Sequence, residues 1–320
     1  MSSSLTIVMY HYVRPLGRSR FPAIKGLDLA LFDEQLEYLA RHYCVVGVDV
    51  VLEALETGAA LPRRAALLTF DDGYLDHYTY VFPRLAARGW SGAFFPPASS
   101  AIDRKVLDAN KVHFVLASTA DLDSIIGLIE RSCREEGGAD LAACREKYWK
   151  PGVYDDARVN YVKRMLQVGL PEDLRTKLAG QLFARYVSAD ETAFAEELYA
   201  NVEQLRHMVG AGMHVGSHGD RHRWLSSLGA DEQKAELEGS LRLLRAVGAP
   251  ADRHTLCYPY GDYDGRTLEL AAACGFKAGF TTKVALAQVD AAHRWVLPRL
   301  DTNDLPKSRD AAGDDWVRRM

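Results

Sequence analysis

The stretch AALLTFDDGY, residues 65–74, indicates both the fold class and the chemistry of this chain. Residues 65–70 contain no charge and are mostly apolar or β-branched, which is typical of a buried strand in a parallel sheet. Two adjacent carboxylates, Asp71 and Asp72, follow where this strand ends. In α/β barrels the carboxyl ends of the strands carry the active site. One carboxylate can bind a metal ion while the other accepts a proton, although Asp-Asp-Gly is also a common turn sequence.

Strand and helix patterns alternate on both sides of this stretch. Strands are predicted at residues 5–10, 44–48, 65–70, 91–95, 213–217, 256–259, 278–282 and 295–300. Helices are predicted between them at residues 32–41, 51–56, 78–88, 231–247 and 265–274. Such alternation is typical of parallel strands covered by helices, in a barrel or an open sheet.

Residues 101–205 show helical patterns alone. The helices predicted there are residues 122–133, 158–167, 171–186 and 191–208. Loops between strands and helices tolerate insertions that strands do not. We therefore expect a single domain, residues 1–320, with a helical insertion at 101–205.

The composition argues against several classes of protein. The chain has 320 residues, 48% of them hydrophobic, which is enough to bury one large core. Its net charge of -4 argues against a nucleic-acid or anionic-membrane partner. The five cysteines form no Cys-x-x-Cys pair, a usage typical of a reduced compartment. No segment resembles a signal peptide or a membrane span, so we expect a cytoplasmic protein of undetermined oligomeric state.

A second motif, GSHGDRH at residues 216–222, follows the predicted strand at 213–217. His218 and His222 are four residues apart, which would place them on one face of a helical turn, where they can converge on one ion. Taken alone, such a pair is more often two exposed polar side chains. Two histidines and one carboxylate, with a position left for water, form a known type of catalytic zinc site. Asp72, His218 and His222 would supply this set.

A third motif, CYPYG at residues 257–261, also follows a short predicted strand. A main-chain N–H near Tyr260 would face a developing oxyanion, as acyl transfer requires. Taken alone, this sequence is simply a turn at the end of a strand.

In this order the three motifs resemble the polysaccharide deacetylase family, carbohydrate esterase family 4, over residues 1–100 and 206–305. The resemblance implies a distorted (β/α)7 barrel. It also implies a Zn²⁺ ion, or another divalent transition metal, on Asp72, His218 and His222, with Asp71 as the general base. The implied reaction is removal of the N-acetyl group from an amino sugar.

Two positions depart from the family pattern. Gly219 stands where the family usually has Ser or Thr, which removes a hydrogen bond near the ligands. Cys257 replaces an arginine that orients the catalytic aspartate. Arg299, in LPRLD at residues 297–301, is predicted to substitute for that arginine from across the barrel.

The family's late Leu-x-His motif, which carries the catalytic acid, is missing. Instead, VMYHYV at residues 8–13 resembles the opening of a circularly permuted branch that includes poly-β-1,6-N-acetylglucosamine deacetylases. In that branch the histidine of an N-terminal strand acts as the acid, which implies this role for His11. The alternative is a core histidine bonded at the end of a strand.

Tyr74 and Trp224 are predicted to contact the substrate, Trp224 by offering an apolar platform to a sugar. For a cytoplasmic enzyme we expect a precursor in surface polysaccharide or glycoconjugate biosynthesis rather than a mature polymer. Two alternatives stay open. One is a deformylase or another C–N amidohydrolase, because fold and metal do not fix the acyl group. The other is a binding protein that has lost turnover, which the intact set of predicted ligands argues against.

Overall fold

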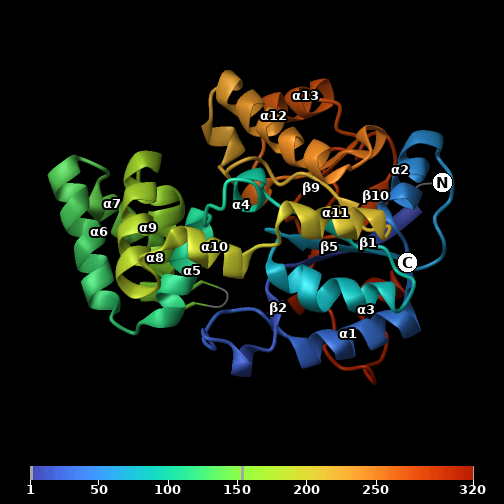
Figure 1. Ribbon diagram of the computed structural model, residues 1–320, viewed down its shortest axis with the longest axis horizontal. Helices are drawn as coiled ribbons and strands as arrows, with labels where there is room; N and C mark the ends of the chain where they lie inside the picture. The colour runs from blue at the N-terminus through green and yellow to red at the C-terminus, as the bar shows by residue number, and fades with distance from the viewer. Residues whose placement is uncertain (1–2, 153–154, 320) are drawn as a thin grey trace. The chain divides into compact units, whose positions relative to one another are not determined.

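The computed structural model describes residues 3–152 and 155–319 and divides into two compact units (Figure 1). Unit 1 comprises the chain up to residue 15, residues 26–105 and the chain from residue 196 onward. Unit 2 comprises residues 16–25 and 106–195. Every site residue predicted from the sequence lies in unit 1.

Parallel strands run side by side in one half of unit 1. Strand β1 (Ser3–Tyr10) pairs in parallel with β5 (Ala65–Asp71). Strand β5 pairs with β6 (Ala93–Phe95), and β6 pairs with β7 (His214–Val215). All positions of β5 are buried, which explains why this strand is so strongly apolar in sequence.

The remaining strands close the barrel. A parallel bridge from Ser217 to Leu256 connects the end of β7 to β8 (Thr255–Cys257), which pairs with β9 (Ala278–Phe280). Leu297 forms a parallel bridge with Phe280, and β11 (Leu300–Asp301) then pairs with β1. Strands β1, β5, β6, β7, β8, β9 and β11 therefore form a closed circuit. The predicted distorted (β/α)7 barrel is confirmed.

Side-chain alternation along β5 determines which way its last residue faces. Leu68 and Phe70 belong to a cluster of buried residues that includes Phe32 of helix α1 (Leu29–His42), whereas Leu67 belongs to a second cluster with Phe280. Successive side chains of a strand point to opposite faces. Asp71 therefore shares the face of Leu67, which is the inside of the barrel.

Helices pack around these strands (Figure 1). They are α1 (Leu29–His42), α2 (Val48–Thr57), α3 (Phe82–Ala86), α4 (Ala98–Ala101), α11 (Val202–Gly210), α12 (Ala230–Val247), α13 (Gly265–Ala273) and α14 (Asp315–Arg318). A π-helical turn, His77–Val81, precedes α3. The short strands β2 (Val13–Arg14), β3 (Leu27–Asp28), β4 (Cys44–Val45) and β10 (Ala287–Val289) complete the unit. The antiparallel pairing of β10 with β1 was not predicted.

The helix predicted at residues 191–208 is two helices, α10 (Glu191–Leu198) and α11. The chain leaves the helical conformation at Tyr199, which forms an antiparallel bridge with Tyr74. Asn201 then starts α11 through a capping box with Gln204. A tertiary contact and a cap therefore interrupt a continuous helical pattern.

Unit 2 is helical in its described residues. It contains α5 (Asp108–Ser118), α6 (Leu122–Glu136), α7 (Leu141–Tyr148), α8 (Ala157–Arg164), a π-helical turn (Met165–Gly169) and α9 (Glu172–Tyr186). Helices α5 and α7 were not predicted, and α7 buries no residue, so its sequence has no apolar stripe. Residues 16–25, predicted to lie outside the insertion, belong to this unit, where the ring of Phe21 packs against Phe114 at 4.9 Å. Across both units, none of the described helices combines the length and apolarity needed to cross a bilayer.

Candidate active site

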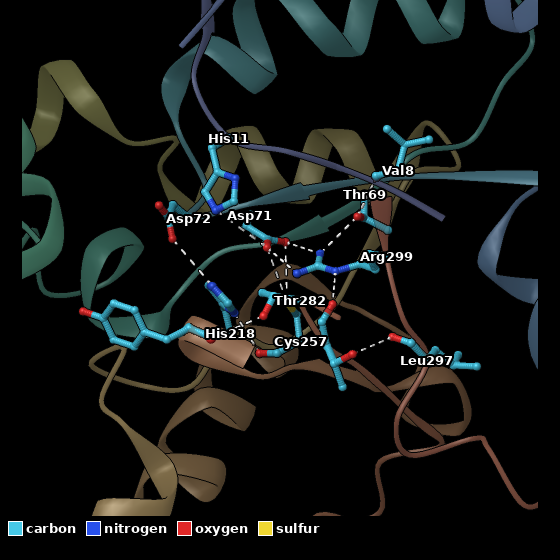
Figure 2. Close-up of polar contacts among 12 residues, drawn as sticks. Val8, His11, Thr69, Asp71, Asp72, His218, Cys257, Thr282, Leu297 and Arg299 are labelled. Atoms are coloured by element: carbon cyan, nitrogen blue, oxygen red, sulfur yellow. Dashed lines mark hydrogen bonds and ion pairs between the residues drawn. The ribbon is translucent and has the colours of Figure 1, made fainter. Parts of the chain in front are cut away.

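The chain turns sharply where β5 ends, and this turn sends the two adjacent carboxylates to different partners (Figure 2). Asp72 and Gly73 both have left-handed backbones, with φ of 69° and 68°. A Cβ at Gly73 would lie 2.5 Å from Cβ of Pro96, so only glycine fits there. As a result Asp72 faces the two histidines of the second motif, whereas Asp71 faces Arg299.

Asp72, His218 and His222 form a buried cluster with the donor atoms of a metal site. Oδ1 of Asp72 lies 3.6 Å from Nε2 of His218 and 3.5 Å from Nε2 of His222. This oxygen accepts no hydrogen bond from the described residues, although it is buried. A buried carboxylate oxygen without a hydrogen bond is costly unless an ion satisfies it. The residues therefore fit a divalent metal ion.

Burial favours the neutral form of both imidazoles, which is the form that binds a metal. Nδ1 of His218 lies 2.7 Å from the carbonyl oxygen of Cys257, so it carries the hydrogen and leaves the Nε2 lone pair facing Asp72. Burial lowers the pKa of His218, and it lowers the pKa of His222 to about 3.

The histidines do not lie on a helical turn, and that expectation was wrong. They belong to a loop between β7 and α12, in which Gly219 and His222 have left-handed backbones with φ of 74° and 60°. Their convergence comes from this loop conformation and not from helical spacing. A Cβ at Gly219 would lie 3.3 Å from Oε2 of Glu236, which leaves little room for the Ser or Thr side chain expected from the resemblance.

Asp71 forms a buried ion pair with Arg299 (Figure 2). Nη1 and Nη2 of Arg299 donate to Oδ1 and Oδ2 of Asp71 at 2.9 and 2.7 Å. The guanidinium also donates to the carbonyl oxygen of Thr281 and the hydroxyl of Thr69. Burial alone would raise the pKa of Asp71, but the guanidinium of Arg299 outweighs it and holds the pKa well below its usual range. Arg299 thus contacts Asp71 from across the barrel, as expected from the sequence.

Cys257 occupies the space beside this ion pair. Its Sγ lies 3.5 Å from both carboxylate oxygens of Asp71. Donor atoms of Asp71, His218 and Cys257 also lie close enough together to share an ion. Burial raises the pKa of the Cys257 thiol well above its usual value, and both oxygens of Asp71 are bonded to Arg299. Asp72, His218 and His222 are therefore the better ligand set.

Breaking the Arg299–Asp71 pair is expected to destabilise the fold. Both side chains are at most 2% exposed, so Arg299→Gln leaves an uncompensated carboxylate in the interior. Loss of one partner of a buried pair costs about 3–5 kcal/mol. Urea unfolding should show that the free energy of unfolding falls by this amount in Arg299→Gln. It should recover in part in the double variant with Asp71→Asn, in which neither charge is left. A loss below about 1 kcal/mol would mean that the pair is well hydrated and not structurally important.

His11 lies beside Asp71 at the end of β1 (Figure 2). Its Nε2 is 4.0 Å from Oδ2 of Asp71, and its side chain is 41% exposed while that of Asp71 is 2% exposed. Nε2 of His77 lies 2.8 Å from the carbonyl oxygen of His11 and donates to it. The structure therefore brings His11 to the predicted site, with one side open to solvent.

Tyr260 and Trp224 stack against each other next to the histidine cluster. Their ring centroids are 4.2 Å apart with an interplanar angle of 5°, and the Tyr260 ring lies 4.5 Å from the His222 ring. Tyr260 has a left-handed backbone, with φ of 58°. The position of Tyr260 suits the predicted main-chain donor to the oxyanion, and the position of Trp224 suits the predicted platform for a sugar. Both roles stay predictions.

The prediction for Tyr74 is corrected by the structure. Its side chain is fully buried, so it cannot contact a substrate. Its hydroxyl donates to Oδ2 of Asp72 at 2.5 Å and thereby leaves Oδ1 directed at the histidines. Tyr74 orients a predicted metal ligand.

Sequence reasoning missed Glu236 and His77. Glu236 lies on α12 and bonds to the histidine loop, and His77 bonds to the main chain of His11. One signal was available, because the buried face of α12 includes the polar residues Gln233, Glu236 and Ser240 among leucines. Polar residues within an apolar helical stripe indicate hydrogen bonds in the interior.

Comparison with known proteins finds similarity to polysaccharide deacetylases. A sequence profile described as polysaccharide deacetylase matches residues 179–279. The poly-beta-1,6-N-acetyl-D-glucosamine N-deacetylase of Escherichia coli (strain K12) is 42% identical over 67 residues, which are 21% of this chain and 10% of that protein. The chain therefore matches only about a tenth of the length of this relative.

Solved structures show the same fold. IcaB from Ammonifex degensii matches with a TM-score of 0.56 and 20% identity, over 94% of this chain and 93% of that one. The deacetylase PplD from Streptococcus pyogenes, in complex with acetate, matches with a TM-score of 0.55 and 18% identity over the same shares. A de-N-acetylase from Aggregatibacter actinomycetemcomitans matches with a TM-score of 0.55 and 16% identity, over 99% of both chains. The resemblance is confirmed: this chain is similar in sequence to polysaccharide deacetylases over part of its length and shares their barrel fold.

Proposed function

We propose that the protein is a zinc-dependent N-deacetylase that removes the acetyl group from an N-acetylated amino sugar. The observation that carries this proposal is the buried cluster of Asp72, His218 and His222 beside the ion-paired Asp71. The relation to polysaccharide deacetylases supports both the acyl group and the sugar.

Asp72, His218 and His222 would hold the metal ion. Two imidazoles and one carboxylate are a donor set of catalytic zinc sites, and other divalent transition metals accept the same donors. When bound, such an ion supplies a Lewis acid that polarises an amide carbonyl and acidifies water.

The chain's own residues would handle the protons. Asp71 accepts a proton from the attacking water, and Arg299 holds its carboxylate ionised and fixed in orientation. A main-chain N–H near Tyr260 donates to the oxyanion of the tetrahedral intermediate. His11, protonated, donates from Nε2 to the leaving nitrogen, since an amine departs poorly without a proton. The products are acetate and a free amino sugar.

Replacement of His11 by glutamine is expected to slow amides far more than activated esters. An amide needs its leaving nitrogen protonated, whereas an aryl acetate expels a phenolate that needs little assistance. We expect His11→Gln to retain zinc and to lose about 10²–10⁴-fold in turnover of N-acetyl sugars. Steady-state rates on an N-acetyl sugar and on an aryl acetate, measured for both proteins, test this. An equal loss on both substrates would assign His11 to structure or binding.

We further propose that the substrate is built on N-acetylglucosamine. The name of the Escherichia coli relative supports a β-1,6-linked backbone, and the proposal extends to a precursor in surface polysaccharide or glycoconjugate biosynthesis. A mass-spectrometric screen of the zinc-loaded protein tests this against free, nucleotide-linked and oligomeric N-acetyl sugars and their N-formyl analogues. Loss of acetyl from one of these sugars supports the proposal. Loss of formyl alone favours the deformylase alternative, and turnover of none favours a binding protein.

A further inference from the structure

The loop that carries His218 and His222 is held from one side by helix α12. Oε2 of Glu236 accepts the main-chain N–H of Asp220 at 3.1 Å and that of Arg221 at 2.9 Å. Both N–H groups lie between the two histidines in sequence, and Glu236 itself is 3% exposed. One buried carboxylate oxygen therefore accepts two hydrogen bonds from the middle of the loop.

The loop is held from its other side by the start of α4. The carbonyl oxygens of Gly219 and Asp220 accept the N–H groups of Ala98 and Ser99 at 3.1 and 2.9 Å. The main chain between the two histidines is thus bonded on both sides by segments far away in sequence. Its conformation does not depend on an ion to satisfy these groups.

Other residues of α12 also contact the loop that carries the two histidines. A Cβ at Gly239 would lie 2.8 Å from Cγ of Asp220, so the missing side chain lets Asp220 approach the helix. Nη2 of Arg242 donates to Oδ1 of Asp220 at 2.9 Å, and the hydroxyl of Ser217 donates to Ser240 at 2.7 Å. These positions recur at helical spacing, so one face of α12 is shaped to the loop.

We propose that Glu236 is a positioning residue for the metal site, because it fixes the loop that directs both Nε2 atoms at Asp72. The inference rests on the proposed function, since it assigns a role in holding the same ion. Groups that orient metal ligands typically contribute 10–100-fold to metal affinity. Glu236 acts here through the main chain between the ligands, without contacting either imidazole in the described hydrogen bonds.

The test compares Glu236→Ala and Glu236→Gln with a matched control, Glu238→Ala. Glu238 lies on the same helix, is exposed, and pairs with Lys234. Zinc affinity is measured by competition with a chromophoric chelator, and coordination geometry by the visible spectrum of the Co²⁺-loaded protein. Hydrogen exchange of the metal-free protein reports on the order of residues 216–224.

We expect Glu236→Ala to weaken zinc binding about 10–100-fold, to change the Co²⁺ spectrum and to speed exchange in the loop. Glu236→Gln retains a carbonyl oxygen as acceptor and should restore all three properties, and Glu238→Ala should match the wild type. Should the alanine variant not fold, Glu236→Asp carries the same expectation, because the shorter chain withdraws the oxygen from the loop. Wild-type affinity and spectrum in Glu236→Ala, or a loss that glutamine does not rescue, would overturn the inference alone. A wild-type protein that binds no zinc would overturn the proposed function as well.

Discussion

Replacement of any one of Asp72, His218 or His222 by alanine is expected to leave the purified protein without stoichiometric zinc. Their three donor atoms lie within 4.8 Å of one another, and removal of any one leaves only two of these ligands. Affinity should fall by more than the roughly 10–100-fold that loss of an outer hydrogen-bond partner costs. Elemental analysis after dialysis measures the result.

His214→Gln is the matched control for the three ligand variants. His214 lies on β7 four positions before His218, and its Nε2 is 2.8 Å from the hydroxyl of Thr255. Glutamine can keep this hydrogen bond, so the control should retain zinc. Stoichiometric zinc in a ligand variant would remove that residue from the ligand set, and loss of zinc from the control would show that any change near β7 disturbs the site.

Asp71→Asn is expected to keep the metal and lose turnover. Asparagine has the shape of aspartate but cannot take the proton of the attacking water. Removal of a general base lowers the rate by about 10²–10⁴-fold. The carboxylate faces Arg299 rather than the three ligands, so zinc content should stay at the wild-type level. Parallel assays of zinc content and N-acetyl sugar hydrolysis measure the two effects.

The same variant breaks a buried ion pair, so its stability must be controlled. Turnover is compared at a temperature at which circular dichroism shows the variant to be folded. Purification of Asp71→Asn without zinc would reverse the roles of the two aspartates. Wild-type turnover with full zinc would show that the base is another group.

The location of the site was predictable because its residues follow buried strands. The apolar run before Asp71 and the predicted strand before His218 identified two strand ends, and parallel strands place such ends on the same rim. The Arg299 contact also followed from its place near the last strand. The residues that bear the chemistry are thus read from short local patterns in the chain.

The supports of the site were not predictable in the same way. Glu236 lies within the apolar stripe of α12, which indicates a hydrogen bond in the interior but does not identify its partner, the histidine loop. The left-handed conformation of His222 is rare for a residue with a side chain, so helical spacing was the default expectation. The burial of Tyr74 likewise depends on its bridge to Tyr199, which lies far away in sequence. Long-range contacts determine the burial of Glu236 and Tyr74 and the backbone conformation of His222.

The most direct test of the central proposal is the metal dependence of acetate release. The wild-type protein is stripped with a chelator, assayed on an N-acetylglucosamine oligomer, and assayed again after zinc is restored. We predict equal amounts of acetate and new free amine, lost on stripping and recovered with zinc. Hydrolysis that continues at the full rate without metal, or acetate released without new amine, would contradict the account.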